Sequence, residues 1–395
     1  MWMESAAWTP STAWKRGARE LTQADLVLYF GDRAALADPR RHAELRDMHP
    51  QAILLGCSTG GQILGDDVSD DTIAAVALKF AATPLRLAVH DITDTNASHA
   101  CGQALGARLA APHDGGEALS AVFVLSDGLQ VNGTALVAGL CSAVGRHVRV
   151  SGGMAGDGAL FQQTLVGANC APCGGRVAAL GLYGRAVQVA SGSAGGWDVF
   201  GVRRRITNAS GSTLFELDGE PALDLYERYL GPEEAEALPG SALFYPLKIC
   251  DPDRPEHDIV RTVLTVDRER RSMTFAGDMP AGWLAQLMRG THHRLVAGAR
   301  EAGRQASAVT EPVAGLPAPG ASGNDRLAIL ISCIGRRLLM GQRVADEIEA
   351  AAMGLGAGTQ RIGFYSYGEM APHAQSGFCE LHNQTMTITT LSEVH

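Results

Sequence analysis

Residue types that could bind or transform a small molecule gather in two short stretches near opposite ends of the 395-residue chain. The first stretch, 56–63, offers thiol, hydroxyl and bare backbone groups at Cys57, Ser58, Thr59, Gly60 and Gly61. The second, 363–370, offers phenol, glycine and carboxylate groups at Tyr365, Tyr367, Gly368 and Glu369. Each stretch follows an apolar run typical of a buried strand, and ligands of α/β sheets usually bind at such strand ends. Both stretches are therefore candidate ligand-binding turns.

The two stretches offer groups of opposite polarity to a ligand. Gly60 and Gly61 leave backbone N–H donors uncovered, and a nest of such donors suits a carboxylate or phosphate. Arg336 or Arg337 could clamp a carboxylate with two parallel hydrogen bonds. Tyrosine rings and Glu369 suit an ammonium group. This combination favours a small zwitterion such as an amino acid, while the same residues could equally serve as ordinary core and turn residues.

A further glycine-bearing stretch, Gly-Gly-Met-Ala-Gly-Asp at 152–157, contributes Gly153 and Asp157 as candidate ligand contacts. It lacks the Lys-Ser/Thr of a P-loop and the spacing of a dinucleotide fingerprint. We therefore interpret it chiefly as a bend where two backbones approach, with Asp157 capping neighbouring N–H groups.

Cys57 and Ser58 also allow a different class of function, a hydrolase or transferase with one of them as nucleophile. Such a nucleophile needs a histidine within hydrogen-bond reach, and the sequence alone places none beside it. Cys170 and Cys173 form a single Cys-x-x-Cys pair without the second pair that zinc usually needs. A non-enzymatic protein with free thiols is the favoured interpretation.

The two stretches agree at several positions, which indicates an internal repeat. Gly56 aligns with Gly363 and Gly61 with Gly368, and each stretch is preceded by a strand–helix–strand pattern. The sequence predicts an α/β to α+β fold of two similar lobes, with mixed sheets flanked by helices. Strand-like segments between 161 and 217 predict an antiparallel meander in the first lobe. We expect an N-terminal arm over 1–22, lobes over 23–215 and 216–395, and an exposed loop over 311–324.

Composition excludes several classes of function. The formal net charge of −9 argues against nucleic-acid binding, which relies on lysine and arginine. No apolar run approaches the ~20 residues that span a bilayer, and the first residues do not read as a signal peptide. We therefore expect a cytoplasmic protein, without membrane insertion, whose eight cysteines are free thiols.

Seven short segments, in this order, carry a family resemblance: 56–62, 152–157, 245–247, 275–278, 332–337, 364–369 and 382–385. Together they resemble the FIST family of sensory domains over nearly the whole chain, with a FIST N-like first lobe and a FIST C-like second lobe. The resemblance implies an intracellular small-ligand sensor in signal transduction. We expect output through a partner in trans, namely a histidine kinase, a cyclic-di-GMP enzyme or a chemoreceptor, because the chain leaves no room for an effector domain.

One branch of that family resembles heme proteins that sense nitric oxide, so heme b is an alternative ligand. Heme needs an axial histidine on the wall of an apolar cavity. The candidates are His292, His293 and His382, with His99 and His373 further possibilities. No Cys-x-x-Cys-His attachment site is present, so any heme would be non-covalent. A third hypothesis is a ligand-free scaffold, whose tryptophan-bearing arm docks on a second subunit in a homodimer.

Overall fold

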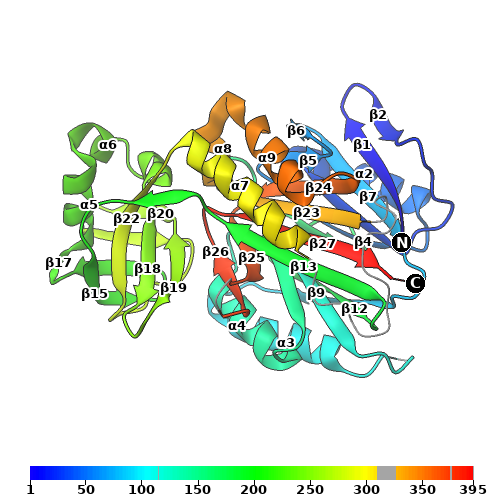
Figure 1. The fold of residues 1–395 in the computed structure, drawn as a ribbon, viewed down its shortest axis with the longest axis horizontal. Helices are drawn as coiled ribbons and strands as arrows, with labels where there is room; N and C mark the ends of the chain where they lie inside the picture. Colours follow the sequence, from blue (N-terminus) through cyan, green and yellow to red (C-terminus); the bar gives the residue numbers. More distant parts are fainter. Residues whose placement is uncertain (114, 309–325, 374–375, 395) are drawn as a thin grey trace.

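The computed structural model describes residues 1–113, 115–308, 326–373 and 376–394. Three six-stranded mixed sheets with flanking helices form a core, and a smaller body of strands and short helices projects from one end of it (Figure 1). The expected mixed α/β class is confirmed. No helix among these residues is long and apolar enough to cross a membrane.

The first unit of the core is built on the parallel pair β3 and β4, with β7 antiparallel beside β3 and β1 antiparallel beside β7. Its elements are β1 (Trp2–Thr9), β2 (Ala13–Arg16), β3 (Leu26–Gly31), α1 (Arg33–Ala37), α2 (Pro39–Met48), β4 (Ile53–Ser58), β5 (Gln62–Leu64), β6 (Asp67–Ser69) and β7 (Ile73–Lys79). The expected N-terminal arm is therefore largely strand: β1 pairs with β7 along its length, and Met1 and Met3 are buried.

The second unit repeats this plan on the parallel pair β9 and β10, with β12 and β8 beside β9. Its elements are β8 (Leu85–Asp91), α3 (Ser98–Ala110), β9 (Leu119–Ser126), α4 (Gly133–Val144), β10 (Arg149–Met154), β11 (Val166–Ala168) and β12 (Arg176–Tyr183). The stretch at 152–157 therefore occupies the place that the bend after β4 has in the first unit.

The third unit uses the parallel pair β23 and β24, with β27 and β13 beside β23. Its elements are β13 (Val187–Ala194), α7 (His292–Ser307), β23 (Arg326–Cys333), α8 (Ile334–Met340), α9 (Ala345–Leu355), β24 (Thr359–Ser366), β25 (Gly368–Pro372), β26 (Cys379–His382) and β27 (Met386–Glu393). Helix α7 lies over β13 and β27 beside α9 (Figure 1). The first and third units therefore share a plan of a parallel strand pair with two antiparallel strands continuing the sheet.

The three units exchange strands in a cycle. The edge strand β11 of the second unit pairs with β4 of the first. The hairpin β5–β6 of the first unit pairs with β24 of the third, and the hairpin β25–β26 of the third pairs with β10 of the second. Backbone hydrogen bonds close the cycle at its centre: Gly156 N to Ser58 O at 2.9 Å, Gly60 N to Tyr365 O at 2.7 Å and Tyr367 N to Met154 O at 3.3 Å.

A glycine stands at the same point of all three parallel pairs. A Cβ on Gly56, Gly152 or Gly363 would lie 2.1, 1.9 and 1.9 Å, respectively, from the carbonyl oxygen of the facing residue on the neighbouring strand. Only glycine permits that approach. The core therefore has three related units, and the internal sequence repeat indicated only the first and the third.

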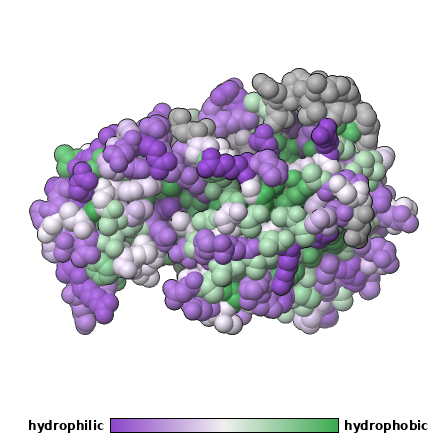
Figure 2. All heavy atoms as spheres, turned by 90° about the horizontal axis from the view of Figure 1, so that it is seen from below, coloured by the Kyte–Doolittle hydropathy of each residue, from purple (hydrophilic) through white to green (hydrophobic). Residues whose placement is uncertain are grey.

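The smaller body is inserted into the third unit between β13 and α7. It comprises β14 (Trp197–Val199), β15 (Arg204–Ser210), β16 (Thr213–Leu217), β17 (Glu220–Pro221), α5 (Ala222–Leu230), α6 (Pro232–Glu236), β18 (Leu247–Asp251), β19 (Arg254–Arg261), β20 (Val263–Asp267), β21 (Ser272–Phe275) and β22 (Leu284–Gly290). This inserted domain, 197–290, has its own apolar core around Ile206, Leu223 and Phe275. Figure 2 shows it at the left, set off from the core by a recess.

The expected meander and the expected lobe boundary both differ from the observed arrangement of strands. Between 161 and 217, β12 pairs with β8 and β9, β13 pairs with β27, and only the consecutive strands β15 and β16 pair with each other as in a meander. The expected lobe boundary at 215/216 lies within β16 of the inserted domain. The segment 311–324, expected as a loop, lies outside the described residues.

Candidate functional site

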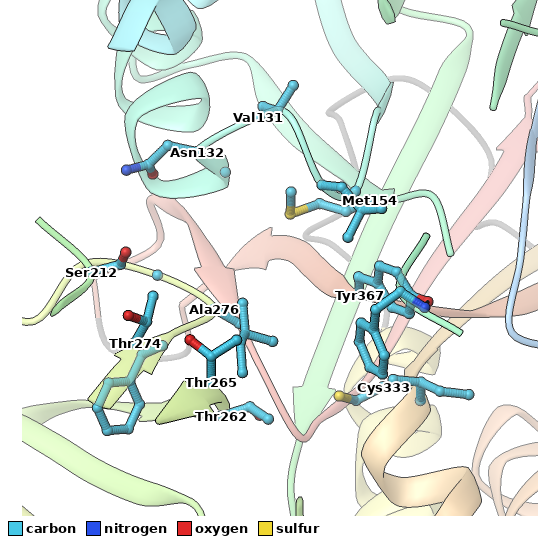
Figure 3. A pocket seen from close by; sticks show the side chains of 18 of the residues that line it. Val131, Asn132, Met154, Ser212, Thr262, Thr265, Thr274, Ala276, Cys333 and Tyr367 are labelled. Atoms are coloured by element: carbon cyan, nitrogen blue, oxygen red, sulfur yellow. The ribbon is translucent and has the colours of Figure 1, made fainter. Parts of the chain in front are cut away.

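A cavity of about 370 Å³ lies between the core and the inserted domain (Figure 3). On the core side it is reached by the carboxyl ends of β9, β10 and β23, where open α/β sheets place their ligands. The residues that line it are Thr95, Gly128, Leu129, Val131, Asn132, Gly133, Met154, Phe161, Ser212, Leu243, Thr262, Leu264, Thr265, Thr274, Phe275, Ala276, Gly277, Cys333, Ile334 and Tyr367. Its volume is within the range of small-molecule sites.

The loop after β9 carries one part of the core wall. Asp127 Oδ1 accepts the N–H groups of Leu129 and Gln130, both at 2.8 Å, which fixes the turn. Asn132 then caps α4 by accepting the N–H of Ala135 at 3.0 Å, as an asparagine at a helix start favours. Its Nδ2 donates to Asp278 Oδ1 of the inserted domain at 2.9 Å, so the residue also joins the two walls.

Tyr367 carries another part of the core wall. Its hydroxyl donates to Asp157, and its ring stacks on Phe161 with centroids 4.6 Å apart. The Asp157 carboxylate also accepts the backbone N–H of Phe161 at 2.9 Å and those of the next two residues. Burial and the neighbouring carboxylate raise the pKa of Tyr367, so this phenol stays neutral. Asp157 thus positions the aromatic pair and does not itself line the cavity.

The inserted domain supplies both apolar side chains and hydroxyl groups to the cavity wall. Ser212, Thr262, Thr265 and Thr274 line this side (Figure 3). Thr262 is only 4% exposed, and its Oγ1 has no hydrogen-bond partner. Among the described residues that line the cavity, none is Asp, Glu, Lys, Arg or His.

Arg336 lies behind the cavity and not in it. It is fully buried with Glu347, to which its Nε donates at 2.7 Å. The guanidinium also donates to the carbonyl oxygens of Gly195, Gln384 and Leu295. Gly195 precedes the inserted domain and Leu295 follows it, so Arg336 clamps both chain crossings between the two bodies.

Tyr365 and Glu369 belong to the same interior. The Tyr365 hydroxyl donates to Glu347 Oε2 at 3.0 Å. Glu369 accepts hydrogen bonds from the Ser366 hydroxyl at 2.9 Å and from the backbone N–H and hydroxyl of Thr385 at 3.1 and 2.9 Å. Burial raises the pKa of Glu369 to about 8, against the opposing effect of those hydrogen bonds. Both side chains are fully buried and neither lines the cavity.

The first candidate stretch, 56–63, is buried and its polar groups are hydrogen-bonded within the protein. Cys57 and Ser58 are fully buried, and the Ser58 hydroxyl accepts the N–H of Leu165 at 2.8 Å. The Gly61 N–H donates to Thr59 Oγ1 at 3.2 Å, and the Gly60 N–H donates to Tyr365 O, so the expected nest of free donors is occupied. Gly153 and Gly368 are likewise buried, where their strands pair as β10 and β25. Of the predicted contact residues, Tyr367 lines the cavity and the others lie around it or in the core.

Burial also disfavours the proposed nucleophile. It raises the pKa of the Cys57 thiol well above its ordinary value, which opposes formation of the thiolate. Ser58 Oγ is engaged with Leu165 N. Neither group faces the cavity.

The candidate heme ligands lie elsewhere. His292 Nε2 is 3.0 Å from Asp346 Oδ2, and His293 Nδ1 is 3.2 Å from Thr291 Oγ1. His382 Nε2 is 3.0 Å from Ala371 O, and burial lowers the pKa of this imidazole to about 4. The cavity wall has no histidine among its described residues, so it does not fit a histidine-ligated heme. Within 1–113, 115–308, 326–373 and 376–394, no cluster of three His, Cys, Asp or Glu side chains could hold a metal ion.

Sequence reasoning missed most of the cavity wall. The turn 126–128 and the helix start at Asn132 have recognisable signals, but threonines on short strands of the inserted domain look like solvent-facing residues. Their burial depends on how that domain packs on the core, which no local pattern encodes.

Comparison with models of protein families shows the family of this chain. Residues 25–220 match the FIST N domain and residues 222–372 match the FIST C domain. The chain belongs to the FIST family. FIST domains are small-ligand sensory domains of signalling proteins. No curated protein matches the chain.

The two FIST domains do not correspond to the two bodies of the structure. Their junction at 220/222 falls between β17 and α5 of the inserted domain. Ser212 and the core residues up to Phe161 come from the FIST N part of the cavity wall, and residues from Leu243 to Tyr367 come from the FIST C part. Both family domains are therefore needed to form one cavity.

Proposed function

We propose that this FIST protein is a small-ligand sensor whose ligand binds in the cavity between the core and the inserted domain. The observation that carries this proposal is the place of the cavity, because a ligand there contacts both bodies at once. A ligand that contacts both bodies shifts the balance between their relative positions. The output passes to a signalling partner in trans: a histidine kinase, a cyclic-di-GMP enzyme or a chemoreceptor.

The contacts between the two bodies support a hinge and a second, polar contact. Arg336 holds the two chain crossings at the hinge. Elsewhere between the bodies, His257 Nε2 lies 2.7 Å from Glu380 Oε1, and Arg261 Nη1 donates to Leu381 O at 3.0 Å. A ligand between the bodies can change how firmly the inserted domain is held.

Amino acids and heme are less favoured ligands. A zwitterion would bury two charges against a wall whose described side chains are all uncharged. Heme would lack an axial histidine on the described part of that wall. Both are still included in the experiment, since a visible spectrum and a thermal shift report on them directly.

The test is a thermal-shift screen of small molecules against the wild type and two variants. Ala276→Phe fills the cavity, and Ala281→Phe places the same ring at an exposed position of the inserted domain. A ligand that binds only the folded protein raises the melting temperature. We expect hits to stabilise the wild type and Ala281→Phe but not Ala276→Phe. Hits that stabilise all three proteins equally, or a screen with none, would contradict the proposal.

A further inference from the structure

The two walls of the cavity differ in chemistry. The core side presents apolar surface, including Val131, Met154 and the ring of Tyr367, whereas the inserted domain presents hydroxyl groups set among apolar Leu264 and Phe275 (Figure 3). A ligand that satisfies this lining needs an apolar body and a polar edge that faces the inserted domain.

Thr262 identifies where that polar edge binds. Its hydroxyl is buried, lines the cavity and has no partner in the protein. A buried hydroxyl without a hydrogen bond is unfavourable, and most such groups in proteins are satisfied. The hydroxyl can both donate and accept, so an amide, a lactone or a phenol would satisfy it.

Three charged side chains outside the cavity lining, at Asp278, Arg261 and Asp157, are already hydrogen-bonded within the protein. Asp278 accepts from Asn132 Nδ2. Arg261 donates to the carbonyl oxygens of Asp278 and Leu381 at 3.1 and 3.0 Å. Asp157 accepts from Tyr367 and three backbone N–H groups. A charged ligand would thus be desolvated without a counter-ion, which is costly.

We propose that the ligand is an uncharged small molecule with an apolar body and one hydrogen-bonding edge. The edge binds Thr262 of the inserted domain, and the body packs on Met154 and Tyr367 of the core. This inference rests on the proposed function, since it specifies the ligand of the same cavity. It excludes amino acids and simple carboxylates as the physiological class.

The experiment compares matched compounds that differ in charge. Phenyl, indole and hexyl bodies are each tested as a primary amide, a carboxylate and an ammonium, with affinity measured by calorimetry at pH 7. For at least one body we expect the amide to bind tenfold or more tightly than both charged members. A charged member that binds as tightly as its amide would overturn this inference and leave the proposed cavity intact. If no amide binds while other compounds give shifts that Ala276→Phe abolishes, the inference fails and the proposed function stands.

Two substitutions at one position test the role of Thr262. Thr262→Val removes the hydroxyl at nearly constant shape, and Thr262→Ser keeps it. Because Thr262 Oγ1 has no partner to lose, we expect Thr262→Val to leave the melting temperature of the free protein unchanged or higher. The amide should bind at least fivefold more weakly to Thr262→Val, with Thr262→Ser close to the wild type. Equal affinities for all three proteins would show that the ligand does not use this hydroxyl.

Discussion

The bend after β4 and the bend after β24 begin alike and end differently. Gly56 and Gly363 each face a carbonyl oxygen at the same point of a parallel strand pair, and each bend leads into a strand that joins another unit. The first bend is closed by its own hydrogen bonds around Thr59. The second bend places Tyr367 in the wall of the cavity.

This difference shows that the repeated backbone provides the scaffold and the insertion provides the site. Three related units place three bends around one centre, yet the cavity forms where the inserted domain covers the second and third units. Gln62 and Glu369 also show that equivalent backbone positions can carry different chemistry. They occupy equivalent positions, but Glu369 is a titratable group in the interior behind the cavity.

The largest expected effect is a difference in stability between alanine variants of Arg336 and Arg337, two neighbouring arginines that the sequence does not distinguish. Arg336→Ala leaves Glu347 buried without its cation and removes a donor from each of three carbonyl oxygens. We expect it to lower the free energy of unfolding by about 3–5 kcal/mol. Arg337→Ala removes a donor from Gly60 O and breaks a pair with exposed Asp70 that is typically worth about 1 kcal/mol or less, so we expect the smaller loss. Urea unfolding of both variants measures the difference, and similar losses would refute the clamp at the hinge.

A smaller effect concerns the pH dependence of stability at Glu369. Its folded pKa of about 8 lies above the ordinary value of 4.5, so between these limits the folded protein holds the extra proton. The free energy of unfolding should therefore fall as pH rises from about 4.5 to about 8, by at most about 1.4 kcal/mol per pH unit. The positive charge of Arg336 acts on this carboxyl in the opposite direction and lowers its pKa.

Glu369→Gln supplies the comparison, because it gives the third unit the amide that the first unit has at Gln62. We expect urea unfolding of this variant between pH 5 and pH 8 to lack the part of the decline that Glu369 causes. An unchanged decline would mean that Glu369 titrates in the ordinary range in the folded protein.

Sequence could predict the repeated scaffold because its causes are local. The glycines at 56 and 363 and the cap at Asn132 follow from backbone contacts that only certain residues satisfy. The second unit escaped detection because its exchanged strand β11 comes after a long loop at 155–165, not directly after a bend. Register with β4 defines that strand, and register is not visible in composition.

The site could be predicted only in part because burial reverses the roles of polar residues. Arg336 and Glu369 are types that bind ligands at a surface, but here Arg336 donates to Glu347 and Glu369 accepts from Thr385 N in the interior. Tyr367, which the sequence places just after a strand, lines the cavity, and its role as a ligand contact stays a prediction. The sequence could not identify Thr262, because its importance arises from a buried hydroxyl without a hydrogen-bond partner, which only the structure reveals.

Hydrogen–deuterium exchange with a bound amide tests the central claim most directly, because it shows which segments a ligand protects. We predict that the compound slows exchange at 128–133 of the core and at 262–277 of the inserted domain together, and leaves 57–62 unchanged. Protection at 57–62, or at only one wall of the cavity, would contradict a ligand site shared by the two bodies.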